Sequence, residues 1–199
     1  MLHKAIFLDR DGTLIQDKGY VHRSEDFMPT THAVAGLKEM MAMDFLLVVV
    51  TNQSGIARGM FSESHLRQFH QYMRQYFAAR AVFFSAIYYC PHLAEAPVAR
   101  YRKDCACRKP KPGLFLRAIK ELEIDPKRSY TVGDSARDIV AGRRAGTRTI
   151  LLRDKARASG CTPDFVAPDL LAAANLIAND PRRGARAVEW GRLEIDCAE

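Results

Sequence analysis

Short apolar segments alternate along this chain with longer segments whose apolar side chains recur at helical spacing. Five of the apolar segments have the length and composition of buried strands: residues 5–8, 46–51, 86–89, 129–132 and 149–152. Helical periodicity fits five further segments: residues 33–43, 62–80, 113–122, 136–145 and 168–178. Because this alternation is typical of parallel strands joined by crossover helices, we predict an α/β fold, a Rossmann-like doubly wound parallel sheet.

Length and composition are those of an ordinary globular protein. The 199 residues are 48% hydrophobic and 27% charged, enough for one domain with a core on both faces of a sheet. We assign residues 1–180 to that domain and expect residues 181–199, which lack core periodicity, to form a loosely ordered tail. No apolar run has the length of a membrane span, and the first residues do not resemble a secretory signal. We therefore expect a cytoplasmic protein without a membrane partner, and a monomer, since no coiled-coil seam is visible.

The formal net charge of +7 fits either a nucleic-acid partner or an anionic small substrate. Much of the excess is local, in residues 100–111 and in the tail, and no aromatic residues interleave with it as in single-strand binding surfaces. A solvated basic surface together with a phosphate site accounts for the charge, so we expect no nucleic-acid partner.

The first predicted strand ends in Asp9, Arg10, Asp11 and Gly12. Side chains two residues apart on a strand point the same way, so both carboxylates should meet just past its end. Gly12 allows the sharp turn that opens this position to a ligand. One carboxylate could attack an electrophile while the other transfers the proton, as in phosphoryl transfer through an aspartyl-phosphate. The alternative is a solvated turn after an edge strand, because Asp and Gly are common turn formers.

Polar groups also follow the second and fourth predicted strands, and a basic segment lies between them. Thr51 and Asn52 could hold phosphate oxygens without adding charge, and Asp134 could supply a third carboxylate to a cation such as Mg²⁺. Lys109, in a segment kept extended by two prolines, could neutralise a transferring phosphoryl group. Taken singly, each has a plainer interpretation as a hydrogen-bonded turn, a helix cap or a solvated basic turn. In open parallel sheets, however, ligands bind beyond the carboxyl ends of the strands.

The five cysteines are an odd number in a chain expected to be cytoplasmic, which argues against a disulfide framework. Four potential metal ligands cluster in one loop: Cys90, His92, Cys105 and Cys107. Three thiolates and an imidazole complete a tetrahedral site, so we predict a structural Zn²⁺ that fixes the loop 90–107 and positions Arg108 and Lys109. The alternative is that these are unreactive cysteines beside a histidine that lies there by chance. We interpret Cys161 and Cys197, outside this loop, as unreactive thiols.

Together these segments resemble the haloacid dehalogenase (HAD) superfamily of phosphatases. The superfamily pattern is Asp-x-Asp, Thr or Ser, Lys and Gly-Asp-x-x-x-Asp, and it is matched in this order from residue 5 to about residue 152. The resemblance implies that Asp9 takes the phosphoryl group, and that Asp11 protonates the leaving oxygen and then activates water. It also implies that Thr51 and Asn52 bind the transferring phosphate and that Lys109 stabilises its charge.

The same resemblance implies a catalytic Mg²⁺. Its ligands would be the carboxylate of Asp9, the main-chain carbonyl of Asp11 and the carboxylate of Asp134. Asp138, four residues farther on, is a weaker candidate outside the direct ligands.

The segments 19–22, 51–59 and 88–92, with the zinc loop, are similar to those of heptose 1,7-bisphosphate phosphatases. These HAD members use ordered loops in place of a large cap domain. They remove the C7 phosphate of D-glycero-D-manno-heptose 1,7-bisphosphate in nucleotide-heptose and lipopolysaccharide core synthesis. The resemblance implies a phosphorylated sugar as substrate and contact of Arg108 with the retained phosphate. Leu93-Ala94, where many relatives carry His-Pro, and Ser135, where some carry Lys, leave the anomer preference open.

Three alternatives follow from the same residues. Histidinol-phosphate phosphatases share the scaffold and the zinc loop, and a nucleic-acid end phosphatase would explain the positive charge. A non-catalytic zinc-stabilised binding module is disfavoured, because every expected catalytic position carries a competent residue.

Overall fold

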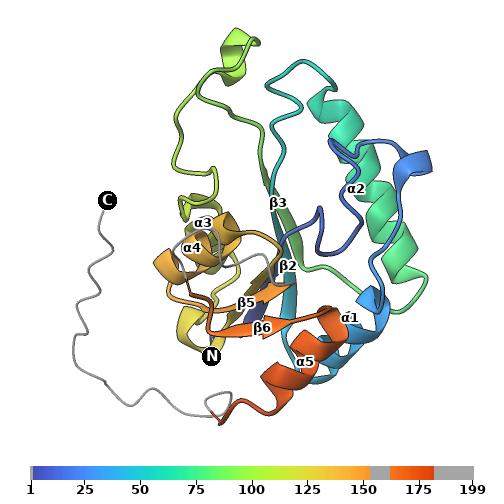
Figure 1. The fold of residues 1–199 in the computed structure, drawn as a ribbon, viewed down its shortest axis with the longest axis vertical. Helices are drawn as coiled ribbons and strands as arrows, with labels where there is room; N and C mark the ends of the chain where they lie inside the picture. Colours follow the sequence, from blue (N-terminus) through green and yellow to red (C-terminus); the bar gives the residue numbers. More distant parts are fainter. Residues whose placement is uncertain (1, 153–161, 182–199) are drawn as a thin grey trace.

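The computed structural model describes residues 2–152 and 162–181, which form one six-stranded sheet with helices on both faces (Figure 1). Neighbouring strands are parallel, in the order β3-β2-β1-β4-β5-β6. The strands are β1 (Ala5–Leu8), β2 (Leu46–Asn52), β3 (Ala86–Cys90), β4 (Tyr130–Gly133), β5 (Arg148–Leu152) and β6 (Phe165–Ala167). The helices are α1 (Ala33–Ala42), α2 (Glu63–Ala78), α3 (Gly113–Glu121), α4 (Ala136–Arg144) and α5 (Leu170–Ala178). The predicted α/β class and parallel sheet are confirmed.

Every predicted strand and helix is present, with its ends within two residues of the predicted positions. The sequence analysis missed β6, a three-residue strand that pairs with β5 at the edge of the sheet. Its three residues are all apolar, but a run this short is below the four to eight residues by which a buried strand is recognised in a sequence. The predictions for residues 182–199, including Cys197, and for Cys161 fall outside the described residues.

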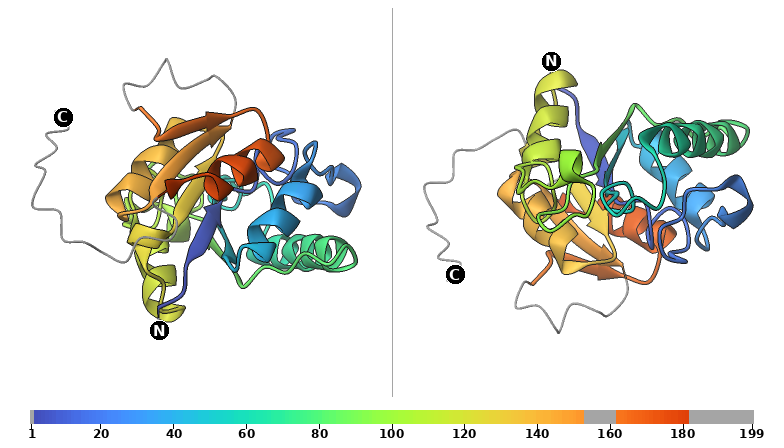
Figure 2. Two further views of the ribbon diagram at one scale, coloured as in Figure 1. Left: turned by 90° about the horizontal axis from the view of Figure 1, so that it is seen from below. Right: turned by 90° about the horizontal axis from the view of Figure 1, so that it is seen from above.

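Alternate residues of β1 face opposite sides of the sheet, and both sides are buried. Ile6 and Leu8 pack in a core with residues of α1, α2 and α5, whereas Ala5 and Phe7 pack with residues of α3 and α4. Figure 2 shows these helix layers on the two sides of the sheet. Because both faces are covered, the central strands are apolar along their whole length rather than alternating.

β1 lies between β2 and β4, where the order of strands along the sheet reverses. Leu8 pairs with Val49 of β2 on one side and with Val132 of β4 on the other. The residues that follow these positions therefore leave the sheet together at one edge. In open α/β sheets this reversal opens a crevice for ligands.

Two long loops rise from this edge. Residues 9–32 contain the 3₁₀ turn Ser24–Asp26, and residues 91–112 contain the 3₁₀ turn Ala99–Tyr101. Neither loop, both of which are fully described, holds an α-helix or a further sheet, which agrees with the prediction that a large cap domain is absent. Of the helices described, none is both long and apolar enough to cross a membrane.

The contact between α1 and α5 supplies a test of this packing. A Cβ atom added to Gly36 would lie 2.4 Å from the main-chain carbon and oxygen of Leu170, so α5 would have to move. We expect Gly36→Ala to lower the free energy of unfolding by about 1–3 kcal/mol, although Ala normally stabilises a helix interior relative to Gly. The measurement is chemical denaturation, with Lys38→Ala on the exposed face of α1 as the control. A Gly36→Ala protein more stable than the parent would contradict the close helix contact.

Candidate active site

A cavity of about 310 Å³ lies beyond the carboxyl ends of β1 and β2. It brings together Asp9, Asp11, Thr51, Asn52, Arg108 and Lys109, the residues singled out for catalysis and substrate binding. Among its other lining residues, Gly19, Tyr20, Gln53 and Ser54 lie in segments that the resemblance singled out without giving them individual roles. The sequence analysis did not identify the remaining two, Asp17 and Arg137. A larger cavity of about 470 Å³ lies beside the start of α2 and the loop 22–25, and none of the predicted site residues lines it.

Lys109 is the electrostatic centre of the cavity. Its side chain is 3% exposed, and its Nζ atom lies 2.8 Å from Asp9 Oδ1 and 2.6 Å from Asp138 Oδ1. The ammonium group also donates a hydrogen bond of 2.7 Å to the Val50 carbonyl at the end of β2. Burial by itself would lower the pKa of Lys109, but attraction to Asp138 and Asp9 outweighs it and raises that pKa. Lys109 is therefore a fixed cation.

The main chain of Lys109 is held by Asn52. The Asn52 Nδ2 group donates to the Lys109 carbonyl, and the Lys109 N–H donates to Asn52 Oδ1, both at 3.1 Å. Asn52 was predicted to bind phosphate, and it lines the cavity, yet both polar atoms of its amide contact this one residue. Its clear role in the structure is to fasten the lysine segment to β2.

Asp9 and Asp134, at the ends of β1 and β4, form a carboxylate cluster with Asp138 of α4. One oxygen from each lies within 4.8 Å of the others. Burial raises the pKa of Asp9 to about 7, against the attraction of Lys109. Lys109 pairs with Asp9 and Asp138, and a cation bound among the three carboxylates would further favour their charged forms. The cluster therefore fits a divalent metal ion.

Both oxygens of Asp138 have partners in the protein. Its Oδ2 atom accepts hydrogen bonds from the main-chain N–H and the hydroxyl of Ser135, at 3.1 and 2.6 Å, and its Oδ1 atom is the one beside Lys109. A Cβ atom on Gly12 would lie 2.1 Å from Asp134 Oδ2, so only glycine leaves room for that carboxylate. The side chain of Asp11 is not part of the cluster.

The Asp11 carboxylate faces a different set of partners. Arg10, which is completely buried, donates from Nε at 3.1 Å to each oxygen and from Nη2 at 2.8 Å to Oδ1. Gln53 donates from Nε2 to Asp11 Oδ2 and to Thr51 Oγ1, both at 2.8 Å. Sequence reasoning missed both residues. The signal for Arg10 was its place between two carboxylates, but strand alternation predicts that it points away from them.

His70, on α2, completes this network. Its Nε2 atom lies 3.2 Å from Arg10 Nη1, and because arginine can only donate, the imidazole accepts. Burial lowers the pKa of His70 to about 3, with further contributions from the positive charges of Arg10 and Arg74. His70 is therefore neutral at physiological pH.

The four predicted zinc ligands converge on one point. The Cys107 sulfur lies 3.1 Å from that of Cys105, 3.2 Å from that of Cys90 and 3.3 Å from His92 Nδ1. All four ligand atoms lie within 4.8 Å of one another. Burial raises the pKa of the Cys90 thiol, so a cation is needed to hold it as a thiolate. The residues fit the tetrahedral site that the sequence predicted, and Arg108 and Lys109 follow directly.

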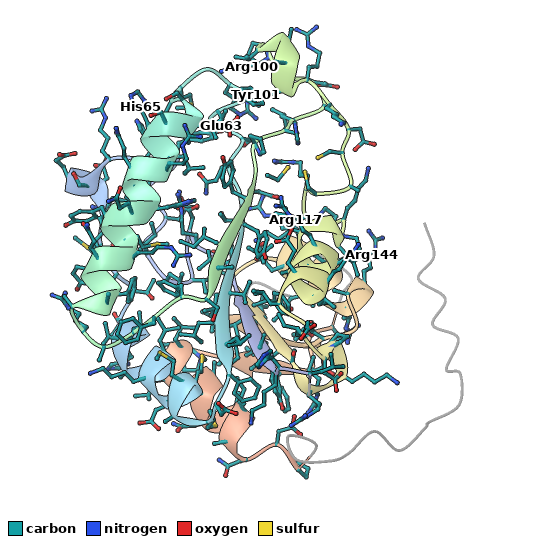
Figure 3. All side chains as sticks on the ribbon, turned by 180° about the vertical axis from the view of Figure 1, so that it is seen from behind. Glu63, His65, Arg100, Tyr101, Arg117 and Arg144 are labelled. Atoms are coloured by element: carbon teal, nitrogen blue, oxygen red, sulfur yellow. The ribbon has the colours of Figure 1, made fainter. Side chains whose placement is uncertain are left out.

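A second attachment holds the far part of the same loop. Glu63, at the start of α2, accepts hydrogen bonds of 2.6 Å from the hydroxyls of Tyr89 and Tyr101. Figure 3 shows Glu63 and Tyr101 close together beneath the tip of the loop. These two hydrogen bonds hold the pKa of Glu63 below its usual range. The loop 91–112 is thus fixed at both its tip and its base.

The buried imidazole gives a stability test. Since the pKa of His70 is about 3 in the folded protein and 6.5 ordinarily, the unfolded chain binds more protons between these pH values, and stability falls as the pH falls. Between pH 7 and pH 5 the parent should lose about 2 kcal/mol more unfolding free energy than His70→Gln. Chemical denaturation at both pH values measures this, with His3→Gln as an exposed control. Equal losses in parent and His70→Gln would show that His70 is not held neutral.

Comparison with known proteins agrees with this geometry. The family profile described as HAD-hydrolase-like matches residues 106–173. D-glycero-beta-D-manno-heptose-1,7-bisphosphate 7-phosphatase of Pasteurella multocida (strain Pm70) is 50% identical over 151 residues, covering 76% of this chain and 82% of that protein. The enzyme of the same name from Escherichia coli (strain K12) is 45% identical over 148 residues, covering 74% of this chain and 78% of that protein.

Solved structures give the same result. The D,D-heptose 1,7-bisphosphate phosphatase of B. bronchiseptica, complexed with magnesium and phosphate, superimposes with a TM-score of 0.78 at 32% identity, covering 88% of this chain and 98% of that one. With the sheet, the carboxylate cluster, the buried lysine and the four-ligand loop in place, this chain belongs to the heptose-1,7-bisphosphate 7-phosphatase family of HAD phosphatases.

Proposed function

We propose that this phosphatase removes the C7 phosphate of D-glycero-β-D-manno-heptose 1,7-bisphosphate and leaves the 1-phosphate. The observation that carries the proposal is the buried Asp9, held 2.8 Å from the Lys109 ammonium at the floor of a cavity that Asp11 also lines. A carboxylate in this position can attack phosphorus, and a neighbouring carboxyl group can manage the proton. The β-anomer of the substrate follows from the names of the relatives.

In the first step, an Asp9 oxygen bonds to phosphorus while the bond from phosphorus to the C7 oxygen breaks. Asp11 supplies the proton that this oxygen takes up. In the second step Asp11 takes a proton from water as the water oxygen bonds to phosphorus and the bond between phosphorus and the Asp9 oxygen breaks, which releases inorganic phosphate and restores the Asp9 carboxylate. Lys109 and the Thr51 hydroxyl, both in the cavity wall, stabilise the transferring group because they are fixed before the reaction begins.

The metal of this site would be Mg²⁺, held by Asp9, Asp134 and the main-chain carbonyl of Asp11. Asp138 would brace Lys109 instead of binding the metal directly, since both its oxygens are engaged by Lys109 and Ser135. When bound, the ion offsets the negative charge of the carboxylates and the phosphoryl oxygens.

Two arginines in the cavity wall suit a second phosphate. Arg108 donates to the His92 carbonyl at 3.1 Å and Arg137 donates to Ser135 Oγ at 3.1 Å, and both line the cavity with Lys109. Arg137 lies in the first turn of α4, two residues after Ser135. A sugar bisphosphate uses two cations in addition to the catalytic lysine, which favours it over a monophosphate.

Histidinol phosphate remains the second candidate because of Asp17. This carboxylate lines the cavity and could face the amino group of histidinol phosphate. It already accepts a hydrogen bond of 2.9 Å from the Gly19 N–H, which orders the loop around it.

The zinc loop is proposed to act structurally. Zn²⁺ bound by Cys90, His92, Cys105 and Cys107 would have no open position for substrate. Its effect on catalysis would come through Arg108 and Lys109, which follow the ligand Cys107 directly in the chain. We further propose that the enzyme is cytoplasmic, because a sugar bisphosphate does not cross membranes and is used where it is made. We also propose that it is a monomer, because no coiled-coil seam is visible in the sequence.

Substrate choice and the role of Asp9 are tested together. With Mg²⁺ we expect phosphate release from the heptose bisphosphate with a kcat/KM at least about tenfold above that for histidinol phosphate, and loss of activity with chelator. Asp9→Asn should reduce kcat by more than about 1,000-fold while the circular dichroism spectrum is retained, because the amide cannot form the phosphoenzyme. Turnover by Asp9→Asn at the parent rate would refute the mechanism. Preference for histidinol phosphate would refute the substrate.

Metal removal tests the zinc loop. Native protein should contain about one zinc per chain by elemental analysis, since all four ligands converge. Cys105→Ser should lose that zinc and lower the thermal midpoint by about 5–10 °C, because the loop is no longer cross-linked. Cys161→Ser is the matched control and should retain both the zinc and the thermal midpoint of the parent. Native protein free of zinc after purification without chelators would contradict the proposal.

A further inference from the structure

Arg10 is a buried charge that the reaction outlined above does not use. In the sequence it lies between the proposed nucleophile and the proposed acid–base group. Its exposure is 0%, and it is among the largest fully buried side chains of the described residues. A guanidinium is tolerated in such a place only when its donors are paired. Its partners therefore indicate what it is for.

The guanidinium of Arg10 joins three separate parts of the structure. Two of its nitrogens bind the Asp11 carboxylate, and Nη2 also donates to the Val21 carbonyl at 2.7 Å. Nη1 lies 3.2 Å from His70 on α2, and the guanidinium carbon lies 4.9 Å from the centre of the Phe69 ring. A planar group held on its far edge by α2 presents two donors to Asp11 in a fixed direction.

Gln53 holds the same carboxylate from another side. Its Nε2 group donates to Asp11 Oδ2, whereas Arg10 donates to both oxygens of that carboxylate. Three donors from two rigidly placed side chains leave the Asp11 carboxylate little freedom to rotate. Asp11 also lines the cavity, so these partners set the orientation of its carboxylate toward a bound ester.

His70 acts one step farther back. Burial and the charges of Arg10 and Arg74 keep it neutral, which leaves Nε2 able to accept from Arg10. Besides Arg10 and Arg74, Tyr89 is a titratable group near His70, and the centres of the two rings lie 6.0 Å apart. A protonated imidazole could not accept this hydrogen bond.

We propose that Arg10 and His70 are positioning residues: Arg10 aims the Asp11 carboxyl group at the leaving oxygen, and His70 holds Arg10 in that orientation. This inference rests on the proposed role of Asp11 as the acid in the first step. If Arg10 only filled the core, disturbing it would slow the reaction of all substrates alike. If Arg10 positions Asp11, disturbing it slows most strongly the esters whose leaving group needs a proton.

The test compares two esters in single-turnover release of the alcohol, which reports the first step alone. An alkyl phosphate has a poor leaving group that needs the acid, whereas 4-nitrophenyl phosphate has a good one that does not. His70→Leu should lower the alkyl rate by about 10- to 100-fold and the nitrophenyl rate by less than about threefold, with binding of both esters unchanged. His70→Gln, whose side-chain oxygen can accept from Arg10, should recover most of the alkyl rate.

Two further variants complete the comparison. Arg10→Lys retains the charge without the planar pair of donors and should repeat the His70→Leu pattern more strongly, and if it does not fold the His70 pair decides alone. Gln71→Leu, on the exposed side of α2, is the control for an added leucine.

Asp11→Asn separates this inference from the proposed function. If Asp11→Asn shows no dependence on the leaving group, the proposed role of Asp11 fails. If Asp11→Asn shows that dependence but His70→Leu slows both esters equally, or neither, the positioning role is overturned. Selective loss of the alkyl rate in both variants, with recovery in His70→Gln, establishes it.

Discussion

The ion pairs of Lys109 hold the site together. Its ammonium lies between Asp9, after β1, and Asp138, on α4, and it donates to the end of β2. Three elements from different parts of the sequence thus meet at one buried charge. Burying such a group is costly unless it is paired, so the segment that carries it must be placed accurately. The two hydrogen bonds between the Asn52 amide and the Lys109 main chain provide that placement on one side.

The rest of the placement comes from the long loop that precedes Lys109. A loop of this length between two core elements would ordinarily be costly to order. The four clustered metal ligands at its base and the hydrogen bond that Tyr101, at its tip, donates to Glu63 reduce that freedom. Both attachments lie outside the reacting centre. They explain how a HAD phosphatase without a large cap domain can still present a defined wall to its substrate.

The charged groups in and beside the cavity form two sets with different electrostatic surroundings. On one side Lys109, Asp9, Asp134 and Asp138 form a dense group of opposite charges that suits a metal ion and a transferring phosphoryl group. On the other side Asp11 is withdrawn from that group and held by uncharged Gln53 and by Arg10, whose charge is backed by α2. Two carboxylates separated by one residue therefore have distinct surroundings, which is the physical requirement for distinct chemical roles.

Much of this protein followed from local patterns in the sequence. Apolar runs and helical periodicity predicted five of the six strands and all five α-helices of residues 2–152 and 162–181, because side-chain period reflects which faces are buried. The convergence of Asp9, Thr51 and Lys109 was predictable, since the carboxyl ends of parallel strands share one edge. The clustering of the cysteines with His92 was predictable from their chemistry and spacing. β6 was not, because three residues are too few to show a period.

Only the tertiary structure decided which side chains contact which. Arg10 turns back toward Asp11 because the chain leaves β1 at Leu8, so strand alternation no longer applies to it. Asn52 occupies a strand end suited to phosphate, yet a loop 57 residues later supplies the partner for its amide. His70 shows only helical periodicity in the sequence, and its meaning depends on the guanidinium packed against it. The sequence by itself thus determined the scaffold and the edge where the chemistry gathers. The orientation of each polar group was set by contacts between distant segments, which no local pattern records.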